Sequence, residues 1–199
     1  MIFLNVPPIV LLSAKPHLSA ISVIERLVLT KSLADVLFAL GHYVDAAKYY
    51  KMCLEREPEN RRLVLCHSLA LVNSGNVKDG LVDLFRLDYE NDNDVDVKRI
   101  IAWGYLVNCK PNDAERVYDW IVNSDRAIDS DWLNCGYVKF ILSKTAEAVR
   151  CFQRFVEQNE ATGQRELLKR ELANDWKILS KNGVKDYEAH LIVDIVMTK

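Results

Sequence analysis

The sequence predicts an all-α protein in which helix–turn–helix units stack as repeats, and three periodic columns of residues carry this prediction. Small residues recur at a spacing of 34 positions, a large apolar residue follows each of them by four, and a residue suited to a tight turn precedes each by five. A helical pair of this size cannot bury its apolar face alone, so it must stack on copies of itself. The columns are Ala46, Gly80, Ala114 and Ala148; Tyr50, Leu84, Tyr118 and Phe152; and Gly41, Gly75, Cys109 and Ser143.

The bulk composition agrees with this fold class. The chain has 199 residues, of which 50% are hydrophobic, and this length allows a short repeat array. It contains seven glycines and five prolines, too few for a turn-rich all-β fold. The formal net charge of -2 gives no field that would attract a phosphate backbone, so we expect no nucleic-acid partner.

The 34-residue period divides the middle of the chain into four frames without insertions between them. We expect residues 1–26 to hold an apolar segment and the start of the first helix. Residues 163–199 are expected to form a capping helix and a tail, because a solenoid needs a terminal element with one polar face. The frames are 27–60, 61–94, 95–128 and 129–162.

Local signals predict where helices begin and end. Ser22 and Glu25 form a Ser-x-x-Glu capping box, which predicts a first helix that starts near Val23. Gly41 suits the positive φ that commonly follows a helix. Pro111 can open a second helix, because the first helical position does not need its N–H group.

The close approach of the two helices in each frame has a steric basis. Antiparallel helices reach an interaxial distance of about 8–10 Å only where the side chains at their crossing are small. The small column of the second helices therefore needs a matching column on the first helices. The sequence supplies it at Ala34, Ser68, Ala102 and Gly136.

The C-terminal part predicts a cap. After a break at Thr162–Gly163, apolar residues recur at helical spacing from Leu167 to Leu179, which predicts one amphipathic helix. Asn182–Gly183 should end this helix. The pattern of the last apolar stretch, Tyr187–Val196, fits a helix or a strand, and we interpret it as a helix docked on the cap.

Two features bear on the cellular compartment. The apolar run Met1–Leu12 lacks a basic leader and is too short to span a bilayer, so the sequence predicts a cytoplasmic protein without a membrane anchor. An odd number of cysteines without close pairs predicts neither a disulfide framework nor a zinc site. We interpret them as small apolar side chains: Cys53, Cys66, Cys109, Cys135 and Cys151.

Motifs of catalysis and metal binding are missing from the sequence. It contains no Gly-x-Ser-x-Gly elbow, no His-Glu-x-x-His and no glycine-rich phosphate loop. The acidic run that starts at Asp88 has Asn93 and Arg99 where a calcium loop needs glycine and a carboxylate, so we interpret it as a turn between repeats. We therefore expect no catalytic residue, no metal and no cofactor, and predict that the protein is not an enzyme.

On these residues the sequence resembles the tetratricopeptide repeat (TPR) family. The fourth frame places Trp132, Cys135–Gly136, Ala148 and Phe152 at the family's Trp, Leu-Gly, Ala and Phe positions. The resemblance covers about two-thirds of the chain. It implies a right-handed α-α superhelix, a TPR solenoid in which the first helix of each repeat lines a concave groove, and a role in binding other proteins.

The residues that map to this groove are the predicted binding site. They combine aromatic anchors, aliphatic side chains and three cations, which suits a hydrophobic or amphipathic peptide segment oriented by Lys31, Arg62 and Arg99. The family's clamp for a terminal carboxylate is disfavoured, because Asp35 and Asp96 stand where it needs other residues. The predicted groove residues are Lys31, Asp35 and Phe38; Arg62, Leu65, Leu69 and Val72; Arg99, Trp103 and Leu106; and Leu133, Tyr137 and Phe140.

An assembly role is the alternative hypothesis. In this hypothesis the groove is occupied from within, by Met1–Leu12 or Tyr187–Val196 of the same chain or of a second copy, which allows a homo-oligomer. Such an occupant would cover the apolar groove, which would otherwise exceed the patch that soluble monomers usually expose.

Overall fold

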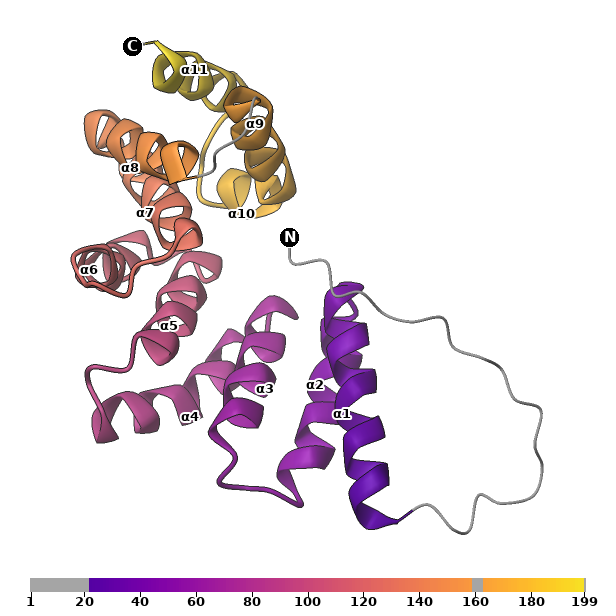
Figure 1. Ribbon diagram of the computed structural model, residues 1–199. Coiled ribbons are helices and arrows are strands. Elements are labelled where there is room, and N and C mark those ends of the chain that lie inside the picture. The colour runs from indigo at the N-terminus through magenta and orange to yellow at the C-terminus, as the bar shows by residue number, and fades with distance from the viewer. Residues whose placement is uncertain (1–21, 159–162, 199) are drawn as a thin grey trace, which may run out of the picture.

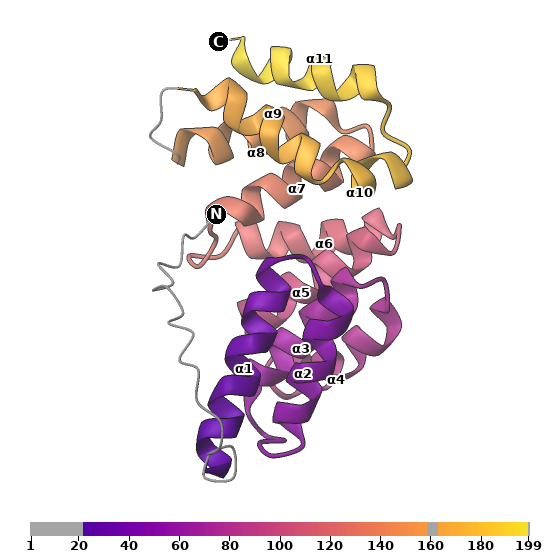
Figure 2. The ribbon, with the colours of Figure 1, turned by 90° about the vertical axis from the view of Figure 1, so that its right-hand side faces the viewer.

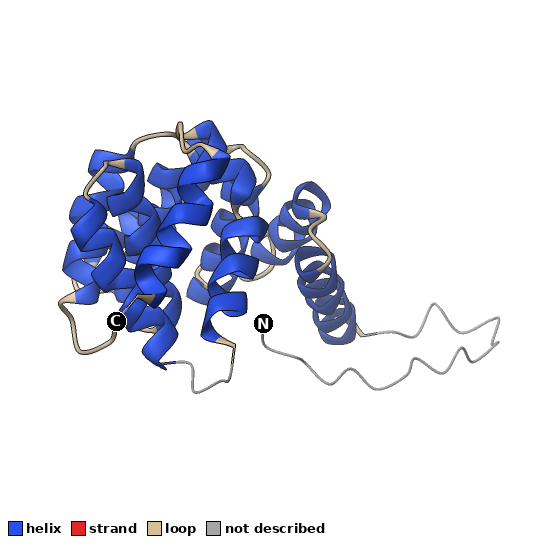
Figure 3. Ribbon diagram, turned by 90° about the horizontal axis from the view of Figure 1, so that it is seen from above, coloured by secondary structure: helices blue, strands red, loops and turns tan. Residues whose placement is uncertain are grey.

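The computed structural model describes residues 22–158 and 163–198, and this part of the chain consists of helices and the loops between them, without a strand (Figures 1 and 3). The predicted occupant Met1–Leu12 lies outside the described residues. Among the helices that the structure describes, none has the length and the apolar content needed to cross a membrane.

Helices α1 to α8 form four antiparallel pairs. The second helices of the pairs begin at residues 43, 77, 111 and 145, so the predicted 34-residue spacing separates each from the next. The predicted capping box at the start of α1 is also present. The pairs are α1 (Val23–Ala39) with α2 (Tyr43–Leu54), α3 (Arg61–Asn73) with α4 (Val77–Glu90), α5 (Val95–Val107) with α6 (Pro111–Val122), and α7 (Asp129–Ile141) with α8 (Thr145–Gln158).

The turn inside each pair has the same backbone conformation. Gly41 and Gly75 have φ angles of 80° and 93°, and Cys109 and Ser143, at the equivalent repeat positions, have φ angles of 56° and 59°. This is the left-handed region, which glycine enters without strain and other residues enter at a cost. The predicted turn column is therefore confirmed, and the third and fourth repeats keep its geometry without glycine.

The small and large columns meet in the core. Ala46, Ala114 and Ala148 are completely buried, and so is the Phe152 side chain. A Cβ atom added to Gly136 would lie 2.5 Å from the Phe152 ring, so only glycine fits at this crossing. The predicted steric basis of the helix pairing is thereby confirmed.

The pairs stack into an arc (Figures 1 and 2). Figure 1 shows α4 and α6 on the outer side of this arc and α3, α5 and α7 on its inner side. The arrangement is an all-α helical repeat solenoid, as predicted.

The C-terminal part differs from the prediction in one respect. The predicted single helix is divided at Asp175 into α9 (Gln164–Asn174) and α10 (Trp176–Lys181). Asn174 and Asp175 are weak helix formers, and the break lets the short α10 change direction. The last helix, α11 (Asp186–Met197), packs on α8 and α9, which confirms the prediction of a docked helix at Tyr187–Val196.

Candidate functional site: the inner surface

The residues predicted to line the groove divide into an accessible set and a buried set. Lys31, Asp35 and Phe38 of α1, Leu65 and Leu69 of α3, and Arg99 and Trp103 of α5 are half-buried, whereas Arg62 of α3 is exposed. These eight residues on the first three repeats are called the inner surface below. It combines apolar side chains with cations, which is the chemistry expected of the predicted site.

Trp103 is fixed in place by a neighbouring repeat. Its indole Nε1–H donates a hydrogen bond of 2.7 Å to Oδ1 of Asn73, which joins α5 to the end of α3. A half-buried indole held in one orientation loses little conformational freedom on binding, which favours an anchor position. This hydrogen bond makes Trp103 the candidate anchor of the inner surface.

Contacts with α2 also hold the α1 residues of the inner surface in place. The Tyr50 hydroxyl of α2 donates a hydrogen bond of 2.7 Å to Asp35. Burial and this carboxylate raise the pKa of Tyr50 well above its usual range. Phe38 packs edge to face on Tyr43, with ring centroids 5.2 Å apart. Asp35 therefore has a structural partner within its own repeat.

Two ion pairs connect successive first helices. Arg61 of α3 binds Asp94, the residue that caps the start of α5, with Nε 2.9 Å from Oδ2. Although burial opposes it, the hydrogen bonds from Arg61 and from the backbone lower the pKa of Asp94. Arg99 of α5 binds the buried Asp131 of α7 at 2.9 Å.

The Arg99 guanidinium consequently has a structural role between repeats. Besides Asp131, its guanidinium donates to Asp96 at 2.8 Å and to the carbonyl oxygen of Arg126 at 2.6 Å. The sequence predicts that Arg99 orients a ligand, but the hydrogen-bond donors of this side chain already have partners within the protein. The cations left for that role on the inner surface are Lys31 and Arg62.

Four predicted groove residues are buried, and their prediction as surface residues was wrong. The Tyr137 side chain has no exposed area, and neither do Val72 and Leu106, while Leu133 retains 6%. Val72 packs in the core that α3 shares with α4 and α5, and the other three pack in the core around α5 to α8. Packing between repeats thus accounts for the apolar character of these positions.

Residues 175–182 pack on the end of the third repeat and share a buried core with Tyr137 of the fourth. Lys181 Nζ donates to the carbonyl oxygen of Val107 at 2.9 Å, and Asn182 Nδ2 donates to that of Leu106 at 3.1 Å. These bonds bring the end of α10 to the end of α5, as Figure 1 also shows. Residues 175–182 thus lie beside the buried Tyr137 of the fourth repeat, whereas the predicted occupant Tyr187–Val196 packs on α8 and α9.

A half-buried acidic group, Asp175, lies at the start of this segment. Burial raises the pKa of Asp175 to about 6, the charge of Glu171 adds to the rise, and the Tyr137 hydroxyl opposes it. The hydroxyls of Tyr118 and Tyr137 are buried as well. Burial raises the pKa values of both tyrosines, and the largest further rise comes from the charge of Asp131 for Tyr118 and from that of Asp175 for Tyr137.

Sequence comparisons do not assign a family. No family model matches the chain, and no curated protein shows significant sequence similarity to it.

Solved structures with the same arrangement of helices exist at low sequence identity. A tetratricopeptide repeat protein from Parabacteroides merdae ATCC 43184 is similar with a TM-score of 0.60 and 16% identity, over 86% of this chain and 71% of that one. The chain has the TPR fold. A double mutant of MamA RS-1 gives a TM-score of 0.55 and 12% identity over 90% and 100% of the two chains. Another MamA mutant gives 0.54 and 15% over 84% and 97%.

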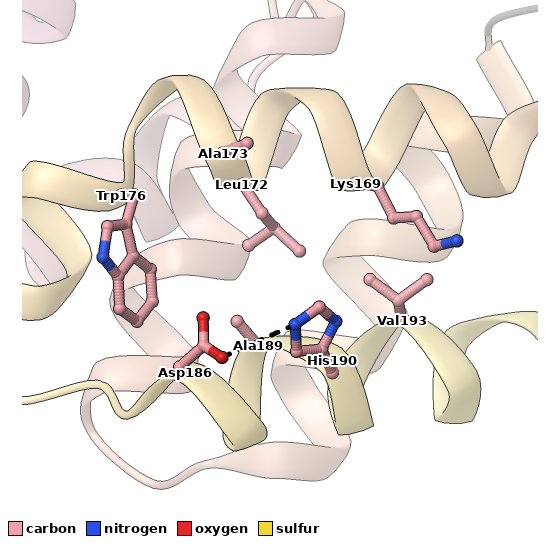
Figure 4. Close-up of a pocket in the computed structure, with 8 residues that line it drawn as sticks. All are labelled: Lys169, Leu172, Ala173, Trp176, Asp186, Ala189, His190 and Val193. Atoms are coloured by element: carbon pink, nitrogen blue, oxygen red, sulfur yellow. Dashed lines mark ion pairs between the residues drawn. The ribbon is translucent and has the colours of Figure 1, made fainter.

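The TPR array carries a second concave feature, between α9 and α11 (Figure 4). This pocket has a volume of about 390 Å³, and its apolar floor can accept an apolar side chain. His190 and Asp186 form an ion pair of 3.6 Å at its rim when the histidine is protonated. The lining residues are Lys169, Leu172, Ala173, Trp176, Asp186, Ala189, His190 and Val193.

The sequence does not reveal this pocket or the packing of residues 175–182. The apolar spacing of Leu172 and Trp176 predicts one straight capping helix. Asn174–Asp175 and Asn182–Gly183 were the available signals that the segment bends twice. Phe140, predicted as a groove residue, is half-buried and lines a small pocket beside Gly183.

Proposed function

We propose that this chain is a non-enzymatic, cytoplasmic interaction module that binds an apolar or amphipathic peptide segment on the inner surface of its first three repeats. The observation that supports this most directly is the contrast along the array. The predicted groove residues Leu133 and Tyr137 of α7 are buried, whereas the eight residues of the inner surface on α1, α3 and α5 remain accessible. The TPR fold of the structural relatives agrees with a role in binding proteins.

The chemistry of the inner surface defines the ligand class. Leu65, Leu69 and Trp103 offer apolar contact on neighbouring helices, and Trp103 is held rigid by Asn73. Lys31 and Arg62 supply positive charge at the same repeat array. A peptide that combines apolar side chains with a carboxylate matches this arrangement, as helix-in-groove ligands commonly do.

Loss of peptide binding on removal of the Trp103 side chain is the expected result that tests this proposal. Short random peptides displayed on phage are selected against the immobilised protein, and the selected peptides are measured by calorimetry. Trp103→Ala should weaken binding at least about tenfold, because buried aromatic anchors commonly contribute more than 1 kcal/mol. Trp103→Phe keeps most of the packing and should weaken it less.

Tyr89→Ala is the matched control for this experiment. Tyr89 is the most exposed large side chain of α4, at 92%, and lies outside the inner surface. Its replacement should leave the affinity of the selected peptides unchanged. Equal binding by wild type and a folded Trp103→Ala, or dependence on Tyr89 instead, would contradict the proposed site.

A second candidate function is self-association through α1. Leu29 is 58% exposed, while its equivalents at the same repeat position, Leu63 and Val97, are buried. Val36 is 47% exposed, while its equivalent Ala70 has no exposed area. In the later repeats this face is covered by the preceding helix pair, so α1 has an apolar stacking face without a partner among the described residues.

Light scattering with size-exclusion chromatography tests this second candidate. If a second copy binds α1, the measured mass of the wild type should rise with protein concentration. The double variant Leu29→Lys, Val36→Lys should stay a monomer. Val44→Lys, at an exposed position of α2, should behave as the wild type does. A wild-type mass that stays monomeric at all concentrations would exclude self-association.

A further inference from the structure

Two buried cysteines face each other where α7 and α8 cross. Cys135 precedes Gly136 on α7, and Cys151 precedes Phe152 on α8. The close approach of the helices at Gly136 brings the two Sγ atoms to 3.5 Å. A disulfide bond needs about 2.05 Å, so the sulfurs must approach each other by only about 1.5 Å, within reach of small side-chain rotations.

The charged neighbours of the pair distinguish the two sulfurs. Cys135 Sγ donates to Asp119 Oδ1 at 3.9 Å, and Lys139 Nζ lies 2.9 Å from the other oxygen of that carboxylate. When Cys151 ionises, the Cys135 S–H can donate a hydrogen bond to the Cys151 thiolate. The positive charge of Lys139 also stabilises this thiolate. The pKa of Cys151 is therefore lowered despite burial, and that of Cys135 is raised. Cys151 is the better nucleophile of the pair.

We propose that Cys135 and Cys151 are a redox-active dithiol that a hydroperoxide oxidises to an intramolecular disulfide. A small oxidant suits the site, because both cysteines are buried and a bulky disulfide reagent would not reach them.

Both steps of this oxidation balance with a hydroperoxide as the electron acceptor. The Cys151 thiolate attacks the terminal peroxide oxygen, the O–O bond breaks, and Cys151 becomes a sulfenic acid while the leaving oxygen takes a proton. Cys135 Sγ then attacks Cys151 Sγ, the S–O bond breaks, and the hydroxide leaves as water with the Cys135 proton. Asp119, which accepts from Cys135, is placed to relay that proton. With hydrogen peroxide, two thiols lose two hydrogen atoms and the peroxide yields two waters.

The other cysteines lack this arrangement. Cys53 is buried, Cys66 is half-buried and Cys109 is exposed, and in the described part of the chain none of them has a second sulfur in contact. The described residues also contain no group of three or more ligating side chains that would make a metal site of the pair. Disulfide formation is thus the chemistry that the geometry supports at Cys135 and Cys151.

The disulfide would hold α7 and α8 of the fourth repeat together and would not involve the residues of the inner surface. It joins two cysteines that are 16 residues apart in the chain, one on α7 and one on α8, and α9 and α11 pack on α8. The accessible residues of α1, α3 and α5 take no part in it. This proposal is therefore independent of the proposed peptide binding.

Thiol counting after peroxide treatment tests the proposal on the full chain. The protein is exposed to a modest excess of hydrogen peroxide, denatured, alkylated and digested. The expected result is a loss of two of the five thiols, a mass lower by two hydrogen atoms, and one cross-linked peptide that joins Cys135 to Cys151. Dithiothreitol should restore all five thiols, since a disulfide is reducible whereas higher oxides of sulfur are not.

Serine variants separate the role of Cys151, which attacks the peroxide, from that of Cys135, which closes the disulfide. In Cys135→Ser the reaction should stop at a Cys151 sulfenic acid, which dimedone traps when the treated protein is denatured in its presence, and in Cys109→Ser the disulfide should form as in the wild type. Five intact thiols in the treated wild type, or a cross-link that involves another cysteine, would overturn the proposal. The peptide map of the wild type distinguishes these outcomes even if a serine variant fails to fold.

Discussion

Replacing Arg99 by methionine should lower the free energy of unfolding by about 3 kcal/mol. The change keeps the length of the side chain but leaves the Asp131 carboxylate buried, with only 2% of its side chain exposed. The backbone N–H of Ile128, 2.9 Å from Oδ2, would be its remaining hydrogen-bond donor among the described contacts. Breaking a buried pair by removing one partner commonly costs about 3–5 kcal/mol, and partial exposure of Arg99 places the effect at the lower end. Urea denaturation measures the change.

Arg61→Met provides the matched control. Arg61 and Asp94 connect α3 to α5 as Arg99 and Asp131 connect α5 to α7, but Arg61 keeps 46% of its side chain exposed. An exposed pair typically contributes about 0–1 kcal/mol, so this variant should be nearly as stable as the wild type. Equal destabilisation by the two variants would show that burial does not decide the strength of these connections.

Replacing Lys139 by methionine should cost about 2–3 kcal/mol, the second-largest effect that we expect. Lys139 is buried on α7, and its ammonium binds Glu115 at 2.8 Å, Asp119 at 2.8 Å and Glu147 at 3.1 Å. Burial opposes the charge, but the three carboxylates outweigh it and raise the pKa of Lys139. The cost stays below that of Arg99, because Lys144 still pairs with Glu115.

The pH dependence of stability checks the electrostatic origin of the Lys139 effect. Against the opposing effect of burial, hydrogen bonds from Lys139 and Lys144 lower the pKa of Glu115 below 4.5. Stability gained from a lowered carboxyl pKa is present above the unfolded value and is lost as the pH falls through the folded value. The difference between wild type and Lys139→Met should therefore shrink below about pH 4.5. A difference that stays constant into acid would indicate lost packing instead.

The fold could be predicted from the sequence because steric requirements repeat along it. Ala46 and its equivalents must be small for the helices to cross, and Gly41 and Gly75 must allow a positive φ. Requirements of this kind act on single positions, and a fixed spacing reveals them even where Cys109 or Ser143 replaces glycine.

The candidate site was less predictable, because accessibility depends on segments outside the repeat. Tyr137 occupies the same repeat position as Trp103, yet the first is buried and the second is half-buried. Asp175 lies at the Tyr137 hydroxyl and Leu179 packs in the same core, and hydrophobic spacing does not encode the helix break at Asp175. Likewise, the contact of Cys135 with Cys151 needs the distance between two helices, and a scattered set of cysteines gives no such distance.

If the array binds a peptide as proposed, the burial of Leu133 and Tyr137 in the fourth repeat limits the length of that peptide. Neighbouring helices in such stacks lie about 8–10 Å apart, so three first helices offer a track of about 20 Å. Roughly six extended residues, or about thirteen helical ones, span that length. The proposed ligand would therefore be a short linear motif that ends before Lys181 and Asn182, which lie against the end of α5.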